Sequence, residues 1–250
     1  MNETAIRFLS RCFAPAETIA LLLRRKSPAV PTQRVVRLET ALAPRYRAWL
    51  AYENGTGANI YVAANPLHPG SRKRTKESIA SVRHLYIDID TDGDARLAAL
   101  RASDLVPPPT SILSTSPGKY QVLWRVEGFD FARQEQMLKL LAIAFGGDPA
   151  CTDCNRGVPG FLNRKYAPAH PVTAEYPDDS IWTPDDFRLD ISAVDAMLLD
   201  HGSSPRKQPG KLSNSESDWA WVIDQLAHGK DAVKLTRELA SHCSDKPNPL

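Results

Sequence analysis

The spacing of apolar and polar positions predicts a chain of short helices and strands in mixed order. In the first third, apolar residues recur at helical spacing over 3–13, 15–26 and 44–53, while the runs QRVVRL and NIYVA predict strands over 33–38 and 59–63. A short helix follows near Thr75. Further along, the same patterns predict strands over 84–90, 110–115 and 120–126, and helices over 94–101 and 131–144.

Strands that alternate with crossover helices indicate an α+β or α/β core with one main sheet. Ser116, Pro117 and Gly118 separate two strand-like runs and predict a hairpin turn. Residues 201–218 are rich in Ser, Pro, Gly and basic residues, which is typical of a linker. We therefore expect one large domain over 1–200 and, over 219–250, the start of a helical domain that is cut short.

Composition narrows the class of protein without identifying it. The 250 residues carry a net charge of +2, so affinity for nucleic acid has to come from a local basic patch. No apolar stretch is long enough to span a bilayer, and the N-terminus does not resemble a signal peptide, which predicts a cytoplasmic protein with no membrane partner. The four cysteines are scattered, and we expect them to be reduced.

The run LYIDIDTDG holds the most informative pair of residues. Side chains two apart on a strand point to the same face, so Asp88 and Asp90 should project together, with Tyr86 on their side. Two neighbouring carboxylates repel each other, and a divalent cation between them would offset that repulsion. An all-oxygen site favours Mg²⁺ or Mn²⁺, and two such ions are the usual means of nucleotidyl transfer.

Other interpretations of these motifs compete with the metal site. A lone D-x-D is more often a solvated turn. An EF-hand loop that began at Asp88 would need a glutamate where Ala99 stands. Cys151 and Cys154 have the spacing of half a zinc site, but no second pair lies at a suitable distance. His84 beside the acidic run is expected to be a buried structural histidine.

Several motifs in one order make the chain similar to a known family. They cover residues from about 5 to the end, and the order resembles that of RepB-like DNA primases of plasmids and mobile elements, which belong to the archaeo-eukaryotic primase superfamily. The motifs are IYVAANP, RKRTKESI, RHLYIDID, TSPGKYQVLWRVEGF, GGDPACTD, PGFLNRKY and SESDWAWVIDQLA.

The resemblance implies an α+β fold, with a primase-like core whose palm sheet is RRM-like and carries three acidic metal ligands, followed by a short helical segment. Asp88 and Asp90 match the first pair. The third acid is Asp148 or Asp153, and Asp153 is favoured because it precedes Arg156 at about the family's position. The superfamily's phosphate-binding histidine corresponds to Gln121, which weakens that part of the analogy.

Cationic and amide side chains complete the predicted site. Lys119, Arg156, Asn163 and Lys165 are expected to contact the nucleotide's phosphates, with Gln121 assisting. For template DNA we expect contacts from a basic run before the acidic strand, which consists of Arg72, Lys73, Arg74 and Lys76. Arg164, which lies between Asn163 and Lys165, is expected to contact the DNA as well. A solvated loop and a solvated hairpin lysine are the competing interpretations of the run and of Lys119.

Together these features predict a metal-dependent DNA primase that uses nucleoside triphosphates and a single-stranded DNA template, with a replicative helicase as a further candidate partner. Asp88→Ala should abolish primer synthesis and leave folding intact. Two alternatives stay open: a non-catalytic replication-initiation protein that keeps the primase fold, and a metal-dependent nuclease.

Overall fold

The computed structural model describes residues 2–26, 31–147 and 154–190. The chain divides into two compact units, Met1–Asp200 and His201–Leu250. The second unit lies outside the described residues, so the linker over 201–218 and the helical segment over 219–250 stay predictions. Within the described ranges, no helix is long and apolar enough to cross a bilayer.

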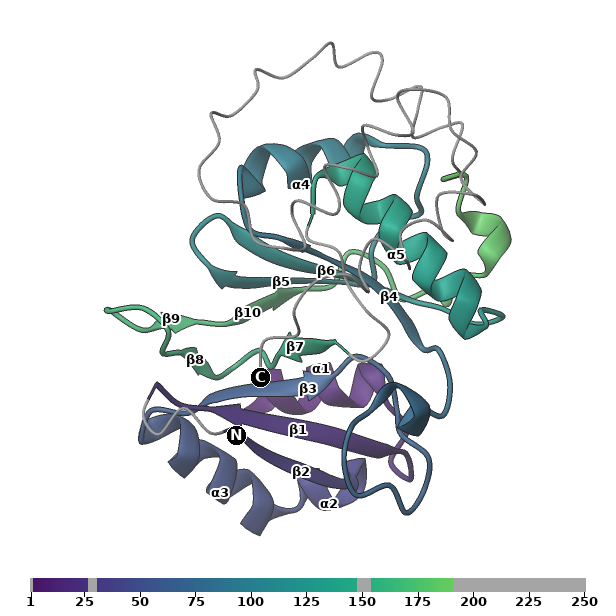
Figure 1. The fold of residues 1–250 in the computed structure, drawn as a ribbon. Helices are drawn as coiled ribbons and strands as arrows, with labels where there is room; N and C mark the ends of the chain where they lie inside the picture. Colours follow the sequence, from purple (N-terminus) through teal and green to yellow (C-terminus); the bar gives the residue numbers. More distant parts are fainter. Residues whose placement is uncertain (1, 27–30, 148–153, 191–250) are drawn as a thin grey trace, which may run out of the picture. The chain divides into compact units, whose positions relative to one another are not determined.

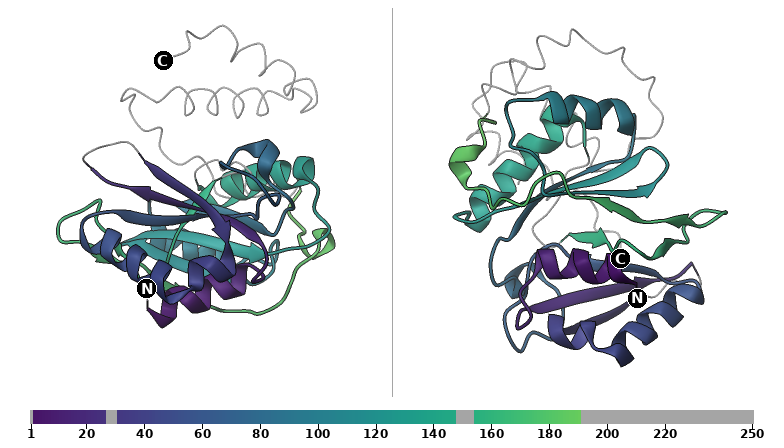
Figure 2. Two further views of the ribbon diagram at one scale, coloured as in Figure 1. Left: turned by 90° about the horizontal axis from the view of Figure 1, so that it is seen from below. Right: turned by 180° about the vertical axis from the view of Figure 1, so that it is seen from behind.

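The first of two four-stranded sheets comes mainly from the N-terminal third (Figure 1). Its strands pair antiparallel in the order β2-β1-β3-β7: β1 (Thr18–Arg24), β2 (Thr32–Arg37), β3 (Asn59–Ala63) and β7 (Asn155–Gly157). Three helices accompany it: α1 (Glu3–Cys12), α2 (Leu38–Leu42) and α3 (Pro44–Gly55). Seen from behind, α1 in purple and α3 in dark blue lie against this sheet (Figure 2).

The helix predicted over 15–26 is wrong, because most of that segment is strand β1. The run TIALLLR is buried on both faces: Leu21 belongs to the main core, while Ala20 packs with Leu67 and Ile79 in a second cluster. A strand buried on both faces shows no alternation, and a leucine-rich run has high helix propensity, so its pattern resembles that of a buried helix. The pairing with β2 and β3 decides the outcome.

The second sheet has the strand order β10-β5-β6-β4 and is also antiparallel: β4 (His84–Ile89), β5 (Ser111–Ser116), β6 (Lys119–Arg125) and β10 (Thr173–Glu175). Helices α4 (Gly93–Ala102) and α5 (Phe131–Phe145) lie on one face of it (Figure 1). The order β4-α4-β5-β6-α5 is the βαββα arrangement expected of an RRM-like palm. The expectation of one main sheet is corrected, since the described residues form two four-stranded sheets.

Short elements complete the described chain. Residues 64–83, between β3 and β4, contain a 3₁₀ turn at Lys76–Ser78, where a short helix was predicted. After β7, the strands β8 (Leu162–Asn163) and β9 (His170–Pro171) pair as a small hairpin, and a second 3₁₀ turn covers Pro184–Asp186. The other predicted helices and strands are confirmed to within a few residues.

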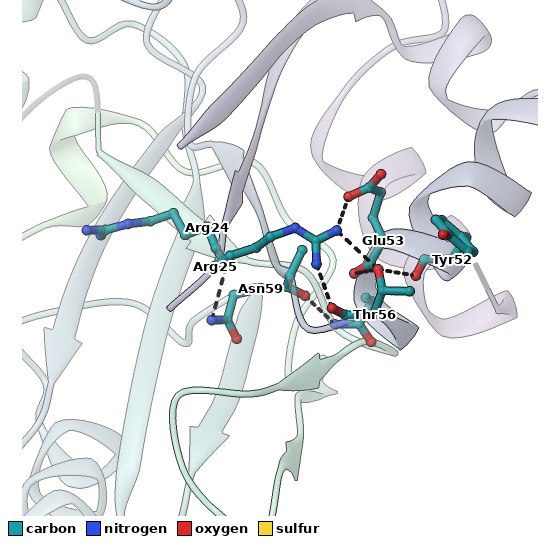
Figure 3. A network of polar contacts seen from close by, with 8 residues as sticks. Arg24, Arg25, Tyr52, Glu53, Thr56 and Asn59 are labelled. Carbon is teal, nitrogen blue, oxygen red and sulfur yellow. Dashed lines mark hydrogen bonds and ion pairs between the residues drawn. The ribbon is translucent and has the colours of Figure 1, made fainter. Parts of the chain in front are cut away.

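Arg25, just past β1, fixes the end of α3 (Figure 3). Its guanidinium donates to the Glu53 carboxylate at 2.5 Å, to the Thr56 carbonyl at 2.6 Å and to the Thr56 hydroxyl at 3.1 Å. A helix C-terminus leaves carbonyl groups without partners, and a cation there also offsets the helix dipole. The network therefore ties α3 to β1 and holds its side chains in place against the sheet.

Candidate active site

Asp88 is the penultimate residue of β4, and Asp90 stands just beyond that strand in a tight turn. Asp92 has φ 51°, and a Cβ added to Gly93 would lie 2.0 Å from the Gly118 carbonyl oxygen. Only glycine allows the start of α4 to approach the β5-β6 turn so closely. The turn thus brings Asp90 beside the start of β6.

The Asp88 carboxylate is held from two directions. Its Oδ1 accepts a hydrogen bond from Arg156 Nη1 at 2.5 Å and another from Gln121 Nε2 at 2.9 Å. Gln121 lies directly opposite Asp88 on β6, whereas Arg156 comes from β7 of the first sheet. Gln121 also accepts from the Gly157 backbone N–H at 2.7 Å. Asp88 therefore sits where the two sheets are joined by polar contacts.

Arg156 is almost completely buried, with 1% of its surface exposed. Its guanidinium lies 4.4 Å from the centre of the Tyr86 ring. Burial alone would lower the pKa of Arg156, but the Asp88 carboxylate and Tyr86 outweigh it, and the pKa is raised overall. The group stays charged. Because Tyr86 and Asp88 both contact this one side chain, the predicted common face of the two residues is confirmed.

Lys119 and Asp90 form a more open pair on the same side of the site. The Lys119 ammonium lies 3.5 Å from Asp90 Oδ1, and the two side chains are 30% and 50% exposed. Ion pairs this exposed contribute little to stability. Both groups are accessible to a ligand, which is the condition for the phosphate contact predicted for Lys119.

Both candidates for the third acid, Asp148 and Asp153, lie outside the described residues, but residues on either side of that segment can be located. A Cβ added to Gly147 would lie 2.3 Å from a side-chain carbon of Ile87 and 2.8 Å from the Asp88 carbonyl oxygen. On the other side, Arg156 bonds Asp88 directly. Gly147 and Arg156, on the two sides of that segment, therefore both lie beside the acidic strand.

A divalent cation fits the described residues in part. Carboxylate oxygen is the donor that Mg²⁺ and Mn²⁺ prefer, and Asp88 Oδ2 has no hydrogen-bond partner among the contacts of the described chain. Within the same ranges, no group of three or more Asp, Glu, His or Cys side chains is close enough together to hold an ion. Asp88 and Asp90 would supply at most two ligands, and a third would have to come from outside the described residues.

The cationic cluster after β7 approaches the site through Asn163. Its Nδ2 donates to the Thr115 carbonyl on β5 at 2.8 Å, and its Oδ1 accepts from the Lys165 N–H at 3.0 Å. The Arg164 N–H donates to Asn59 Oδ1 at 2.6 Å, which fixes this stretch to β3. Lys165 itself is exposed. The phosphate contacts predicted for Asn163 and Lys165 stay predictions.

The basic run before the acidic strand lies at the other end of β4. Lys76 pairs with Glu135 near the start of α5, and the preceding residue, Gln134, donates to the His84 carbonyl at 2.8 Å. His84 begins β4 and Asp88 is four residues on, about 13 Å along a strand. Arg72 and Lys73 are exposed, and Arg74 is partly exposed. Their predicted contact with DNA is not tested by this arrangement.

His84 is a buried structural residue, as expected. Its Nδ1 lies 2.6 Å from the Ala64 carbonyl oxygen, and its ring packs edge-on against Phe13. Burial lowers its pKa to about 4, so the ring is neutral near pH 7. Cys154 is partly buried, and Cys151 lies outside the described residues.

Sequence reasoning missed three residues that build the site. Tyr86 was placed on the correct face without its contact to Arg156, and neither Gly147 nor Gly157 was assigned to the site. The pair Gly146-Gly147 did carry a signal, because one glycine is enough to end a helix and a second indicates a close approach. Only the fold shows that Gly147 lies against the strand that carries Asp88.

Solved structures with the same fold are primase domains. One is the catalytic domain of primase RepB′ in complex with initiator DNA, with TM-score 0.56 and 17% identity over 80% of this chain and 97% of that one. Another is the AEP domain of the cyanophage S-2L primase-polymerase, with TM-score 0.57 and 15% identity over 79% and 96%. Primase RepB′ itself matches at TM-score 0.54 and 16% identity, over 89% and 68%.

The two sheets and their helices therefore define an archaeo-eukaryotic primase fold. The family model described as the RepB DNA-primase N-terminal domain matches residues 26–175. The chain belongs to the RepB DNA-primase family, which supports a role as a DNA primase. A search of curated proteins gave no match.

Proposed function

We propose that the chain synthesises primers on single-stranded DNA as a metal-dependent nucleotidyl transferase. The observation that carries the proposal is the position of Asp88, at the junction of the two sheets with Asp90 at the end of the same strand. Family membership supports the same role. Nucleoside triphosphates would be the substrates and a single-stranded template the partner, in keeping with the initiator DNA named for the RepB′ catalytic domain.

Asp88 and Asp90 would hold Mg²⁺ or Mn²⁺, together with Asp153 or Asp148. When bound, the ions would activate the attacking 3′-hydroxyl and stabilise the charge on the pyrophosphate that leaves. Gln121 and Arg156 would orient the Asp88 carboxylate, since both bond its Oδ1. A carboxylate held in this way loses little freedom on binding a ligand, which is the benefit of a prearranged site.

Lys119 would contact the phosphates of the incoming nucleotide. Its partner Asp90 is itself a proposed metal ligand, so the ammonium group stays beside the triphosphate when Asp90 turns to the cation. Asn163 and Lys165 would contribute from the segment beside β5, where Asn163 is already bonded to the Thr115 carbonyl. Positioning and charge neutralisation are sufficient for phosphoryl transfer, with no covalent intermediate.

One observation favours a second candidate, a replication-initiation protein that keeps the fold without catalysis. The buried Arg156 already neutralises Asp88, so the carboxylate has less need of a cation. Binding of nucleotide that depends on Mn²⁺ but yields no product would support this alternative. Plasmid or mobile-element replication, a helicase partner and a cytoplasmic location stay predictions.

Primer synthesis on single-stranded DNA tests the proposal. Purified protein is incubated with circular single-stranded DNA, labelled ribo- or deoxynucleotides, and Mg²⁺ or Mn²⁺. We expect short labelled products that require template, nucleotide and metal, and that Asp88→Asn eliminates. Degradation of the DNA without added nucleotide would instead indicate a nuclease. Equal synthesis by wild type and Asp88→Asn would overturn the assignment of the site.

A further inference from the structure

A cavity of about 480 Å³ lies on the first sheet, away from Asp88. Residues from β2, α2 and α3 or their junctions line it: Arg34, Thr40, Ala43, Arg45, Tyr46 and Trp49. In the sheet order β2-β1-β3-β7, strand β2 lies three strands from the one that carries Arg156, about 14 Å at normal strand spacing. The cavity is therefore separate from the candidate active site.

The walls of this cavity are aromatic. Tyr46 and Trp49 meet edge to face, with ring centres 5.1 Å apart and planes at 80°. Both are only partly buried, although they pack against the main core. Partly exposed aromatic side chains are the usual platform for the bases of single-stranded nucleic acid. The Tyr46 hydroxyl oxygen is shielded from solvent and has no hydrogen-bond partner among the described residues.

The rim of the cavity is cationic. The Arg34 guanidinium lies 5.9 Å from the centre of the Trp49 ring, and it donates a hydrogen bond to the Gln33 carbonyl. Arg45 is exposed at the start of α3. Neither arginine pairs with a carboxylate in the part of the chain that the structure describes. Residues 18–49 contain one acid, Glu39, against a set of basic residues: Arg24, Arg25, Lys26, Arg34, Arg37, Arg45 and Arg47.

We propose that this cavity is a second binding site for single-stranded DNA, where a base stacks against Tyr46 and Trp49 while Arg34 and Arg45 contact the flanking phosphates. The inference rests on the proposed function, since a primase has to hold template beyond the nucleotide being copied. The proposal places this template-binding site on the α2-α3 side of the first sheet. The basic run at Arg72–Lys76 is not needed for it. Stacking supplies affinity without sequence preference, which suits a template of any sequence.

Arg45→Glu is the informative charge variant, because it should not harm folding. Arg45 follows Pro44 in the first turn of α3, where an acidic side chain stabilises the helix dipole. A loss of DNA affinity in this variant therefore cannot be explained by unfolding. Lys139→Glu is the matched control, since it makes the same change of charge at an exposed position of α5, the helix that packs on the second sheet.

The assay measures binding of a fluorescent oligodeoxythymidylate by anisotropy, with Mg²⁺ absent and at several salt concentrations. Arg45→Glu combined with Arg34→Gln should weaken binding and lower the slope of log K against log salt by roughly 1.4, the value for two phosphate contacts on a single strand. Trp49→Leu, which keeps an apolar side chain in the core, should weaken binding roughly 5- to 150-fold. Lys139→Glu should bind like wild type.

Unchanged affinity in Arg45→Glu and Trp49→Leu would overturn the proposal, and so would an equal loss in Lys139→Glu. Competition by free thymidine triphosphate as strong as that by the oligonucleotide would also contradict it, since that result indicates a nucleotide site. Failure of wild type to make primers would thus refute the proposed function alone, while the binding comparison tests the cavity.

Discussion

Charge is used in opposite ways at the Asp88 site and at the α2-α3 cavity. Around Asp88, each charged group meets its opposite: Arg156 bonds Asp88, and Lys119 lies beside Asp90. At the cavity, Arg34 and Arg45 meet aromatic rings or solvent and no carboxylate of the described chain. The first arrangement fixes geometry, which chemistry requires, and the second leaves positive charge available for a polyanion.

Asp88→Ala should have the largest effect, and the structure changes what is expected of it. Primer synthesis should fall at least about 10³-fold through loss of a metal ligand. The sequence predicted unimpaired folding, but the substitution leaves the buried Arg156 uncompensated, which costs roughly 3 kcal/mol of unfolding free energy. Urea denaturation and the primer assay measure the two effects separately.

A double variant separates the structural from the catalytic role of this pair. Asp88→Leu with Arg156→Met replaces both charges by apolar groups and should regain most of the lost stability without regaining synthesis. Wild-type stability in Asp88→Ala would show that the pair is not structurally important. Synthesis by the double variant would remove Asp88 from the catalytic site.

Gly147→Ala tests the close approach beside Asp88. A Cβ there would lie 2.3 Å from an Ile87 carbon and 2.8 Å from a carbonyl oxygen, so β4 or the end of α5 has to move. We expect a loss of about 3 kcal/mol, the upper range for overpacking, with reduced synthesis. Gly55→Ala is the control: nothing lies within 4 Å of its added Cβ, and it should be neutral or slightly stabilising. Equal stability of the two variants would contradict the close contact of Gly147 with β4.

His84 should make the protein sensitive to mild acid. Its pKa is about 4 in the folded state and near 6.5 when unfolded, so from pH 6.5 downward only the unfolded state gains a proton. The stability present above pH 6.5 should fall by about 3 kcal/mol as the pH approaches 4. In His84→Asn, whose amide can still donate to Ala64, this dependence should be weaker. If the stability of wild type and of His84→Asn fell in parallel with decreasing pH, His84 would not be the group responsible.

Lys119→Ala should have the smallest effect on stability. The exposed pair with Asp90 contributes less than about 0.5 kcal/mol, so the midpoint of urea unfolding should barely change. If Lys119 contacts phosphate, the KM for nucleotide should nevertheless rise several-fold. A lower midpoint with an unchanged KM would show that Lys119 is structural.

The contrast between the two regions also shows what sequence reasoning could reach. The acidic strand was predicted because its alternation and its carboxylates are local features of seven residues. The partners of Asp88 come from 33 and 68 positions further along, so only the pairing of β6 with β4 and the position of β7 bring them close. The buried strand β1 was predicted as a helix, since a run that is apolar on both faces carries no period.

The α2-α3 cavity could not be predicted from sequence for a related reason. Tyr46 and Trp49 are three positions apart in a helix, a spacing that usually indicates a core face. In the structure both side chains are partly exposed, because β2 is the edge strand of its sheet and no further strand of the described chain lies beyond it to cover them. Arg34 joins them only through its position on that strand.

Manganese binding tests the central claim most directly. Crystals grown with Mn²⁺ and a non-hydrolysable nucleoside triphosphate are measured by anomalous scattering at the manganese edge. The account predicts an anomalous peak within about 2.0–2.3 Å of carboxylate oxygens of both Asp88 and Asp90, next to the triphosphate. A peak coordinated by other residues in a protein that makes primers, with Asp88 still bonded only to Arg156 and Gln121, would contradict it.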